Sequence, residues 1–490
     1  MNKSVSIIGS GFSGLSAAGV LAKKGFNVDV YEKNSIPGGR ASKLQSDGFT
    51  FDMGPTFYWM PDVYDDFFAD FGKKTTDYYE LIRLDPGYKI YFGKDDSVAI
   101  AADLEEIYQT FEKNEAGSSQ FLKKFLKTAE FSYRVAMDKV VYKPGKSFLE
   151  LIMPATALRL FQFLTSVSTV VRRKIKNSKL RQILEFPVIF LGAKPSQTPA
   201  FYCFMNYADM VLGTWHIRGG FFELVKGMKT LAESLGVKIY TNSPVEHIQT
   251  VNNYVTGVVI GGKFQAADLI ISGADYHHSE YLLDEKLRNY SQKYWTKKVF
   301  APSALLFYVG FGRKLEHVSH HTLFFDTDFN LHTEQIYDSP AWPEKPLFYA
   351  SFPSITDCEL APEGKETGIF LIPIAPGLYD TEEVREHYFG QILQRLEMLT
   401  NQSLKDDVLF HSSYAVNDFM HDYNAYKGNA YGLSNILMQT AFLKPKMQNK
   451  QVKNLFYTGQ LTVPGPGVPP TIISGKIAAG LATEYFQSVH

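Results

Sequence analysis

Three glycines near the N-terminus, Gly9, Gly11 and Gly14, constrain the fold more than any other feature of the sequence. They form a G-x-G-x-x-G pattern, and a short apolar run at residues 5–8 precedes them. Between a strand and a helix, this pattern permits a tight turn, lets the backbone approach a pyrophosphate and allows the helix to pack closely on the strand. The phosphate then meets the free N–H groups at the start of the helix. The pattern therefore predicts a dinucleotide site.

The residues after these glycines continue a strand–helix–strand unit. Apolar residues recur at helical spacing from Leu15 to Ala22, and residues 28–31 have the pattern of a second strand. Glu32 ends that strand, where an acidic side chain can bind the ribose hydroxyls of an adenosine. A purely structural turn is the alternative, but it would not need the strand, the helix and the acid at these spacings.

A second glycine pair indicates which dinucleotide is bound. Gly38 and Gly39 follow soon after Glu32, again where the backbone must approach a ligand. Arg40, the next residue, could face the pyrophosphate as a charge-assisted donor. An ordinary glycine loop with a solvated arginine is the alternative. Because an extended FAD must be held at both ends, whereas NAD enzymes do not need this second contact, we expect FAD.

The stretch from Tyr457 to Gly475 has the composition of a ligand-binding loop. A strand leads into a segment rich in glycine and proline and then into a helix that begins near Pro469 or Pro470. Proline suits the first turn of a helix, where its missing N–H is not needed. The positive end of this helix would point at the contents of the loop, which suits a flavin that accumulates negative charge on reduction. A surface loop is the alternative, although it would rarely precede so apolar a helix.

Together these segments resemble the carotenoid (phytoene-type) desaturases, which are FAD-dependent flavoproteins similar to amine oxidases. The resemblance covers nearly the whole chain, and its further motifs are residues 51–56, 219–221, 272–278 and 361–364. Within the family, residues 458–467 look most like the 3,4-desaturases that act on hydroxylated or monocyclic carotenoids. The chain departs from the wider family at Gln460, where an acidic or small residue is frequent, and at residues 462–464, where Thr-Val-Pro replaces Thr-His-Pro.

The resemblance implies where the cofactor and the substrate bind. The implied FAD contacts are Gly9, Gly11, Phe12, Ser13, Gly14, Glu32, Lys33, Gly39, Arg40, Gly54, Pro55, Thr56, Val245, Gly459, Gln460 and Val468. Val245 would lie beside the adenine, and the last three residues would line the ribityl and flavin end. The substrate-side candidates are Tyr58, Trp59, Trp215 and His216, although a lone histidine is more often a core or surface residue. No catalytic residue and no metal ligand is assigned.

The expected fold is α/β (α+β overall) with an interleaved domain order, since 490 residues exceed what one core usually organises. A Rossmann-like FAD-binding domain would be built from the separated segments 1–75, 214–275 and 426–490. A mixed-sheet substrate domain would comprise residues 76–102 and 276–425. A helical, membrane-facing insert would occupy residues 103–213.

Part of the helical insert has the pattern of a membrane-surface helix. From Pro154 onward, polar residues recur at helical spacing in an apolar stretch that ends in basic residues at 172–176. Such a helix can lie in a membrane interface against anionic headgroups, and an amphipathic core helix is the alternative. Since no apolar run of about 18 residues occurs, a spanning helix is not expected. We expect a cytoplasmic protein that associates peripherally with the inner face of the membrane.

Composition excludes several other functions. Fifty basic and 51 acidic side chains give a net charge of −1, without the basic excess of a nucleic-acid-binding protein. The two cysteines, Cys203 and Cys358, cannot form a disulfide framework or a cysteine metal cluster. Neither a Ser-His-Asp set nor paired carboxylates stand out for acid–base catalysis.

The function implied is the introduction of a C=C bond into a long apolar polyene. A hydride would leave an allylic C–H for flavin N5 and a neighbouring proton would be lost, and the charge left on the polyene is delocalised, so a strong base is not required. The resemblance implies 3,4-desaturation of a 1-hydroxylated acyclic or monocyclic carotenoid. Since no second nucleotide fingerprint is seen for NAD(P), we expect electrons to pass to oxygen or a quinone. A redox-neutral carotenoid isomerase and a non-catalytic lipid- or prenyl-binding protein of the same fold stay open as alternatives.

Overall fold

A five-stranded parallel sheet lies at the centre of the nucleotide-binding region. The computed structural model describes residues 3–147, 150 and 160–489 of the chain. In spatial order the sheet contains β19 (Leu455–Tyr457), β13 (Leu269–Ser272), β1 (Ser4–Ile8), β2 (Asn27–Tyr31) and β9 (Lys238–Tyr240). Strands that are far apart in the sequence are therefore hydrogen-bonded neighbours, and the segments predicted as strands at 5–8 and 28–31 form two of them.

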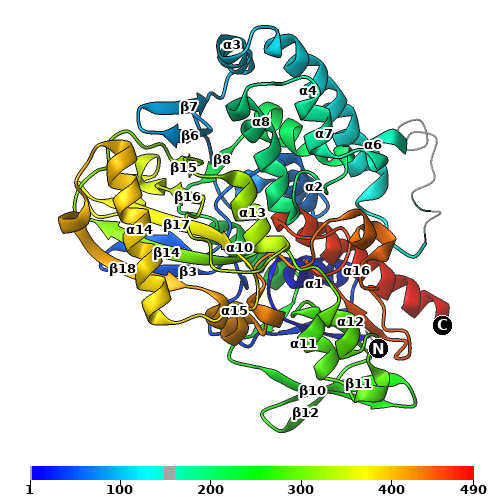
Figure 1. The fold of residues 1–490 in the computed structure, drawn as a ribbon. Helices are drawn as coiled ribbons and strands as arrows, with labels where there is room; N and C mark the ends of the chain where they lie inside the picture. Colours follow the sequence, from blue (N-terminus) through cyan, green and yellow to red (C-terminus); the bar gives the residue numbers. More distant parts are fainter. Residues whose placement is uncertain (1–2, 148–149, 151–159, 490) are drawn as a thin grey trace.

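Three helices pack around this sheet. They are α1 (Phe12–Lys23), α10 (Phe222–Ser234) and α16 (Val468–Val489), and α1 contacts both of the others. The contact of α1 with α16 is close because a Cβ on Gly475 would lie 2.3 Å from the carbonyl oxygen of Ser13. The predicted C-terminal helix is thus present, beginning at Val468, and it joins the two ends of the chain around one sheet (Figure 1).

A mixed seven-stranded sheet forms the second layer. Its spatial order is β18 (Val408–Tyr414), β14 (Ser303–Phe311), β17 (Glu366–Ile374), β16 (Phe348–Ser351), β15 (His321–Phe324), β6 (Tyr88–Gly93) and β7 (Asp96–Ile100). All nine residues of β14 are buried, as expected for a central strand whose faces are both covered. The helix α14 (Glu382–Thr400) packs on this sheet, and α13 (Phe329–Tyr337) contacts β17.

The described residues between 104 and 212 are mainly helical, and the helices α3, α4, α7 and α8 lie in the upper part of Figure 1. The α-helices in this part are α3 (Leu104–Asn114), α4 (Ser118–Val135), α6 (Leu160–Leu164), α7 (Val167–Arg172), α8 (Ser178–Glu185) and α9 (Phe204–Tyr207). The single amphipathic helix predicted from Pro154 onward is interrupted in the structure, so this prediction is wrong. Residues 151–159 lie outside the described residues, and beyond them the chain forms two short helices because the Ser166 side chain accepts from the backbone N–H of Thr169 and begins α7.

The remaining elements are short. The strands are β3 (Lys43–Ser46), β4 (Phe49–Asp52), β5 (Leu81–Arg83), β8 (Trp215–Ile217), β10 (Val245–Val251), β11 (Tyr254–Ile260) and β12 (Lys263–Ala266). The helices are α2 (Pro61–Ala69), α11 (Tyr276–Tyr281), α12 (Gln292–Thr296) and α15 (Val416–Tyr423). Within the part of the chain that the structure describes, none of the helices has the length and apolar character needed to cross a bilayer.

Candidate functional site

The first glycine loop joins β1 to α1. A Cβ on Gly14 would lie 2.0 Å from the carbonyl oxygen of Gly9, so only glycine allows α1 to approach the loop this closely. A Cβ on Gly11 would meet nothing within 4 Å, and the space beside Gly11 is therefore open to a ligand. No side chain caps the start of α1 at Phe12, which leaves the first N–H groups of the helix for an anion.

Glu32 is buried beside this loop, and its carboxylate is already bonded to the backbone. One carboxylate oxygen accepts from the N–H and the hydroxyl of Ser10 at 2.9 and 2.7 Å. The other accepts from the N–H of Asn34 at 2.9 Å. A carboxylate offers about four acceptor positions, so three donors leave room for a ribose hydroxyl. Glu32 thus shapes the loop as well as facing the cavity, a second role that its sequence position did not indicate.

Arg40 provides the clearest test of whether these residues fit an anionic cofactor. Its Nη2 donates to the carbonyl oxygen of Asn429 at 3.0 Å, and its guanidinium lies over the ring of Tyr423. Its Nε is buried and has no hydrogen-bond partner among the described residues. Burial lowers the pKa of this guanidinium, and the nearby Asp275 partly offsets the effect. A pyrophosphate would supply both the missing acceptor and the missing negative charge.

The second glycine pair and the C-terminal loop complete the same site. The N–H of Gly38 donates to the carbonyl oxygen of Ser10 at 3.0 Å, so the two glycine loops are directly joined. At the other end, the hydroxyl of Ser474 accepts from the N–H of Gly459 at 3.0 Å and lies 2.9 Å from the hydroxyl of Thr462. These bonds hold the loop against α16, whose first residues, 468–471, line the cavity.

One cavity of about 690 Å³ connects these segments. Of the predicted FAD contacts, all but Gly14 line it; Gly14 instead supports the loop from behind. The cavity also extends between the helical part and the seven-stranded sheet, where its wall is mostly apolar. That wall includes Met137, Val140, Phe186, Ile189, Phe201, Phe204, Met205, Leu306, Leu323, Phe325 and Leu371.

Among the four substrate-side candidates, the structure brings only Trp59 to the cavity wall. Tyr58 is fully buried, with its hydroxyl 2.9 Å from that of Tyr79. Trp215 lies on β8 and donates its indole N–H to the carbonyl oxygen of Leu212. His216 is buried with Nε2 3.2 Å from Asp357. The sequence predicted these three on the substrate side, but none of them lines the cavity; Tyr58 and His216 are buried, and Trp215 is half-buried.

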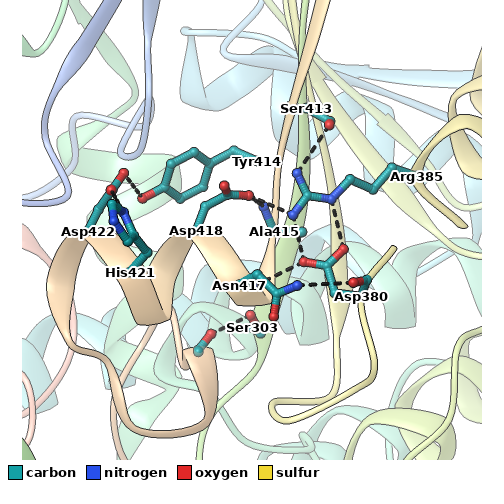
Figure 2. A network of polar contacts seen from close by, with 11 residues as sticks. Ser303, Asp380, Arg385, Ser413, Tyr414, Ala415, Asn417, Asp418, His421 and Asp422 are labelled. Atoms are coloured by element: carbon teal, nitrogen blue, oxygen red, sulfur yellow. Dashed lines mark hydrogen bonds and ion pairs between the residues drawn. The ribbon is translucent and has the colours of Figure 1, made fainter. Parts of the chain in front are cut away.

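Helix α15 is a part of the site that sequence reasoning missed. Its residues Phe419, Asp422 and Tyr423 line the cavity, and the ring of Tyr423 lies under the guanidinium of Arg40. Figure 2 shows the polar network that positions it. Arg385 of α14 binds Asp380 and also Asp418 of α15 at 2.6 and 2.7 Å. No short motif joins these residues, so only the folded chain reveals them.

The described residues thus fit a bound FAD along the part of the cavity lined by the glycine loops and the start of α16. The open space at Gly11, the uncapped start of α1 and the unpartnered Nε of Arg40 accept a pyrophosphate, and Glu32 accepts a ribose hydroxyl. The start of α16 supplies a positive end for the flavin ring. When bound, FAD supplies a two-electron acceptor for a hydride taken from a C–H bond.

Known proteins share both the sequence and the fold. The profile of a family described as flavin containing amine oxidoreductase matches residues 12–482. A carotenoid 3,4-desaturase of Haloarcula japonica is 40% identical over 479 residues, 97% of each chain. A zeta-carotene-forming phytoene desaturase of Myxococcus xanthus is 32% identical over 96% of this chain and 92% of that protein. A 4,4'-diapophytoene desaturase of Staphylococcus haemolyticus is 32% identical over 97% of each chain.

Solved structures with lower sequence identity have the same fold. An oxidoreductase of Methanosarcina mazei aligns with a TM-score of 0.65 at 17% identity, over 96% of this chain and 99% of that chain. Putrescine oxidase aligns with a TM-score of 0.62 at 13% identity over 98% of both chains. Cyclohexylamine oxidase of Brevibacterium oxydans aligns with a TM-score of 0.61 at 16% identity over 99% of both chains.

Proposed function

The chain belongs to the flavin-containing amine oxidoreductases, and we propose that within this family it desaturates a carotenoid. The predicted flavin-dependent oxidoreductase is thereby confirmed, and the substrate is the proposed part. The observation that carries the proposal is a single cavity lined at one part by nucleotide-binding glycine loops and at another by apolar side chains. Similarity to desaturases at 32 to 40% identity over nearly the whole chain supports it.

The protein's own residues have separable tasks in this reaction. The N–H groups at the start of α1, together with Arg40, bind the pyrophosphate, while Glu32 binds the ribose. The apolar wall holds the polyene by the hydrophobic effect, which contributes about 0.8 kcal/mol for each CH₂ removed from water. Its residues Phe201, Phe204 and Phe325 come from different elements, so the wall exists only in the folded chain.

For the regiochemistry, we propose 3,4-desaturation of a 1-hydroxylated acyclic or monocyclic carotenoid. The similarity to the Haloarcula japonica protein, together with residues 458–467, supports this choice. For the electron acceptor we propose oxygen or a quinone, because one dinucleotide fingerprint, the FAD loop at Gly9–Gly14, is seen in the sequence.

A carotenoid resides in lipid, so we also propose that the protein works on the inner face of a membrane. On the helical part, Leu164 is 73% exposed, and Arg173 and Lys174 are exposed after α7. An exposed leucine and two exposed cations on the same helical part suit contact with anionic headgroups. Arg172 is not free for this role because it binds the buried Glu185 through two hydrogen bonds of 2.8 and 2.9 Å.

The test is one anaerobic incubation of the FAD-loaded protein with a 1-hydroxylated carotenoid in liposomes. We expect the flavin absorbance to bleach and the product to be two hydrogens lighter with a red-shifted spectrum. Reoxidation should then need oxygen or a quinone and no NAD(P). A product of unchanged mass would identify an isomerase, and bound carotenoid without bleaching would identify a binding protein; either result would contradict the proposal.

A further inference from the structure

A line of polar side chains leads from the cavity into the seven-stranded sheet. Thr56 and Tyr349 both line the cavity, and their hydroxyl oxygens are 2.8 Å apart. The Tyr349 hydroxyl is also 2.7 Å from Nδ1 of His321. Thr56 belongs to the segment expected to contact FAD, so this line begins at the wall of the cofactor cavity.

Strand register explains why Tyr349 and His321 meet. In the antiparallel pair of β15 and β16, Tyr349 is opposite Leu323, and His321 is two residues further along β15. Residues two apart on a strand share a face, and diagonal neighbours across an antiparallel pair lie within reach of long side chains. The contact therefore depends on the pairing of two strands that are separated by a helix in the sequence.

His321 is well placed to take up a proton. Its side chain is fully buried, its ring stacks on Phe57, and its Nε2 has no hydrogen-bond partner among the described residues. The surrounding titratable groups are Tyr349 on β16, His320 immediately before β15, His216 on β8, Asp52 on β4 and Tyr431. Burial, with a smaller contribution from His216, holds the pKa of His321 well below its ordinary value, so its imidazole is neutral at neutral pH.

We propose that Tyr349 and His321 form the route by which the substrate proton leaves during desaturation. This inference rests on the proposed function. After the hydride has left the polyene, the neighbouring C–H bond breaks and its electron pair becomes the new C=C bond. The proton goes to the Tyr349 oxygen, whose own proton passes to Nδ1 of His321, and the positive charge ends on the imidazole. FAD is the oxidant, so atoms and electrons balance.

A weak base is sufficient for this step. A polyene cation is a strong acid, whereas the His321 imidazole is a weak base because of its burial. The same low basicity returns the proton through Tyr349 to the cavity after the product has left. The route also provides a base that no spacing of carboxylates or histidines in the sequence indicated.

The first test measures the resting proton positions without any reaction. Nitrogen-15 NMR of histidine-labelled, cofactor-free protein, assigned with a His321→Asn sample, should show Nδ1 of His321 unprotonated and accepting from Tyr349 between pH 6 and 8. In Tyr349→Phe the Nδ1 signal should shift. A protonated Nδ1 in the wild type would reverse the direction of the route and overturn the proposal.

The second test measures turnover and solvent isotope effects. Product formation should fall by at least about tenfold in Tyr349→Phe and in His321→Asn, which keeps a hydrogen-bonding group but cannot take up a proton. The wild-type rate should fall in D₂O, and it should fall with decreasing pH only well below the ordinary histidine pKa of 6.5, because burial lowers the pKa of His321; both dependences should disappear in the variants. Tyr388→Phe is the matched control, since that buried hydroxyl donates to the Pro343 carbonyl outside the cavity.

The possible results distinguish a failure of the proposed function from a failure of the proton route. A wild type that forms no product two hydrogens lighter contradicts the proposed function, while the NMR result still tests the route. A wild type that forms this product, with both variants within twofold of its rate and with unchanged isotope effects, overturns the route alone. If His321→Asn alone keeps the wild-type rate and isotope effect, His321 only positions Tyr349, and the proposed proton route is also overturned.

Discussion

Gly11 and Gly14 belong to one motif, but a side chain at each position would meet different surroundings. Gly14 is limited by the protein itself, because the carbonyl oxygen of Gly9 occupies the place of a Cβ. Gly11 has a φ of −67° and open space, so the folded protein accepts a side chain there. Only a ligand in the cavity would exclude it.

This contrast gives the first prediction. Gly11→Ala should change the free energy of unfolding of the cofactor-free protein by less than about 1 kcal/mol, yet it should purify with little FAD. Gly14→Ala should lose FAD and also unfold at lower urea concentration. Gly480→Ala, on a helix with open space around it, is the control and should keep full flavin absorbance. Full flavin occupancy in Gly11→Ala would contradict the pyrophosphate assignment.

Glu32 leads to a second prediction at the same scale. Glu32→Gln should weaken FAD binding, and it should also lower the free energy of unfolding of the cofactor-free protein by about 1.5 to 3 kcal/mol, because its bonds to Ser10 and Asn34 involve a charged acceptor. Glu246→Gln is the control, since exposed Glu246 also accepts from two backbone N–H groups. Equal unfolding curves for wild type and Glu32→Gln would show that Glu32 does not shape the loop.

At the scale of elements, α15 is held in place mainly by charges from elsewhere in the chain. Arg385 is 12% exposed and Asp380 fully buried, so their pair is shielded from solvent. Asp380 also accepts from the N–H of Asn417 at 3.0 Å, which ties the start of α15 to the same carboxylate (Figure 2). Removal of the arginine would leave that buried carboxylate without its counter-charge.

The prediction at this scale is that Arg385→Met destabilises the protein by about 3 to 5 kcal/mol in urea unfolding. FAD affinity should fall as well, because α15 lines the cavity beside the glycine loop. Arg134→Met is the control: its pair with Glu130 is exposed and should contribute less than about 0.5 kcal/mol. Similar losses of unfolding free energy in the two variants would contradict a larger stabilising role for the buried Arg385–Asp380 pair.

At the scale of the whole molecule, the proposed membrane contact is a matter of which surface faces lipid. Leu164→Asp, and Arg173→Glu with Lys174→Glu, should each reduce flotation with anionic liposomes without loss of FAD, and salt should mimic the charge reversal. Leu409→Asp is the control because Leu409 is 55% exposed on β18 of the other layer. Unchanged flotation in all variants would contradict the proposed membrane contact of this surface.

Much of the cofactor site could be predicted from the sequence. Gly9–Gly14, Gly38–Arg40 and the loop before α16 are short segments in which backbone conformation and close approach restrict the residue type. The first strands and the final helix were predictable for the same reason, since their apolar periodicity is local. The resemblance of these motifs then indicated the family, which the comparisons confirmed.

The tertiary structure alone decided the contacts between segments that are far apart in the chain. Tyr349 meets His321 through the register of two strands, and Arg385 of α14 reaches Asp418 of α15 although strand β18 lies between these helices in the sequence. Tyr58, Trp215 and His216 were predicted on the substrate side but do not line the cavity, because residue type and proximity along the chain do not tell which way a side chain turns. Local conformation follows from neighbouring residues, whereas contacts between distant segments depend on how whole elements pack, and that information is spread over the entire chain.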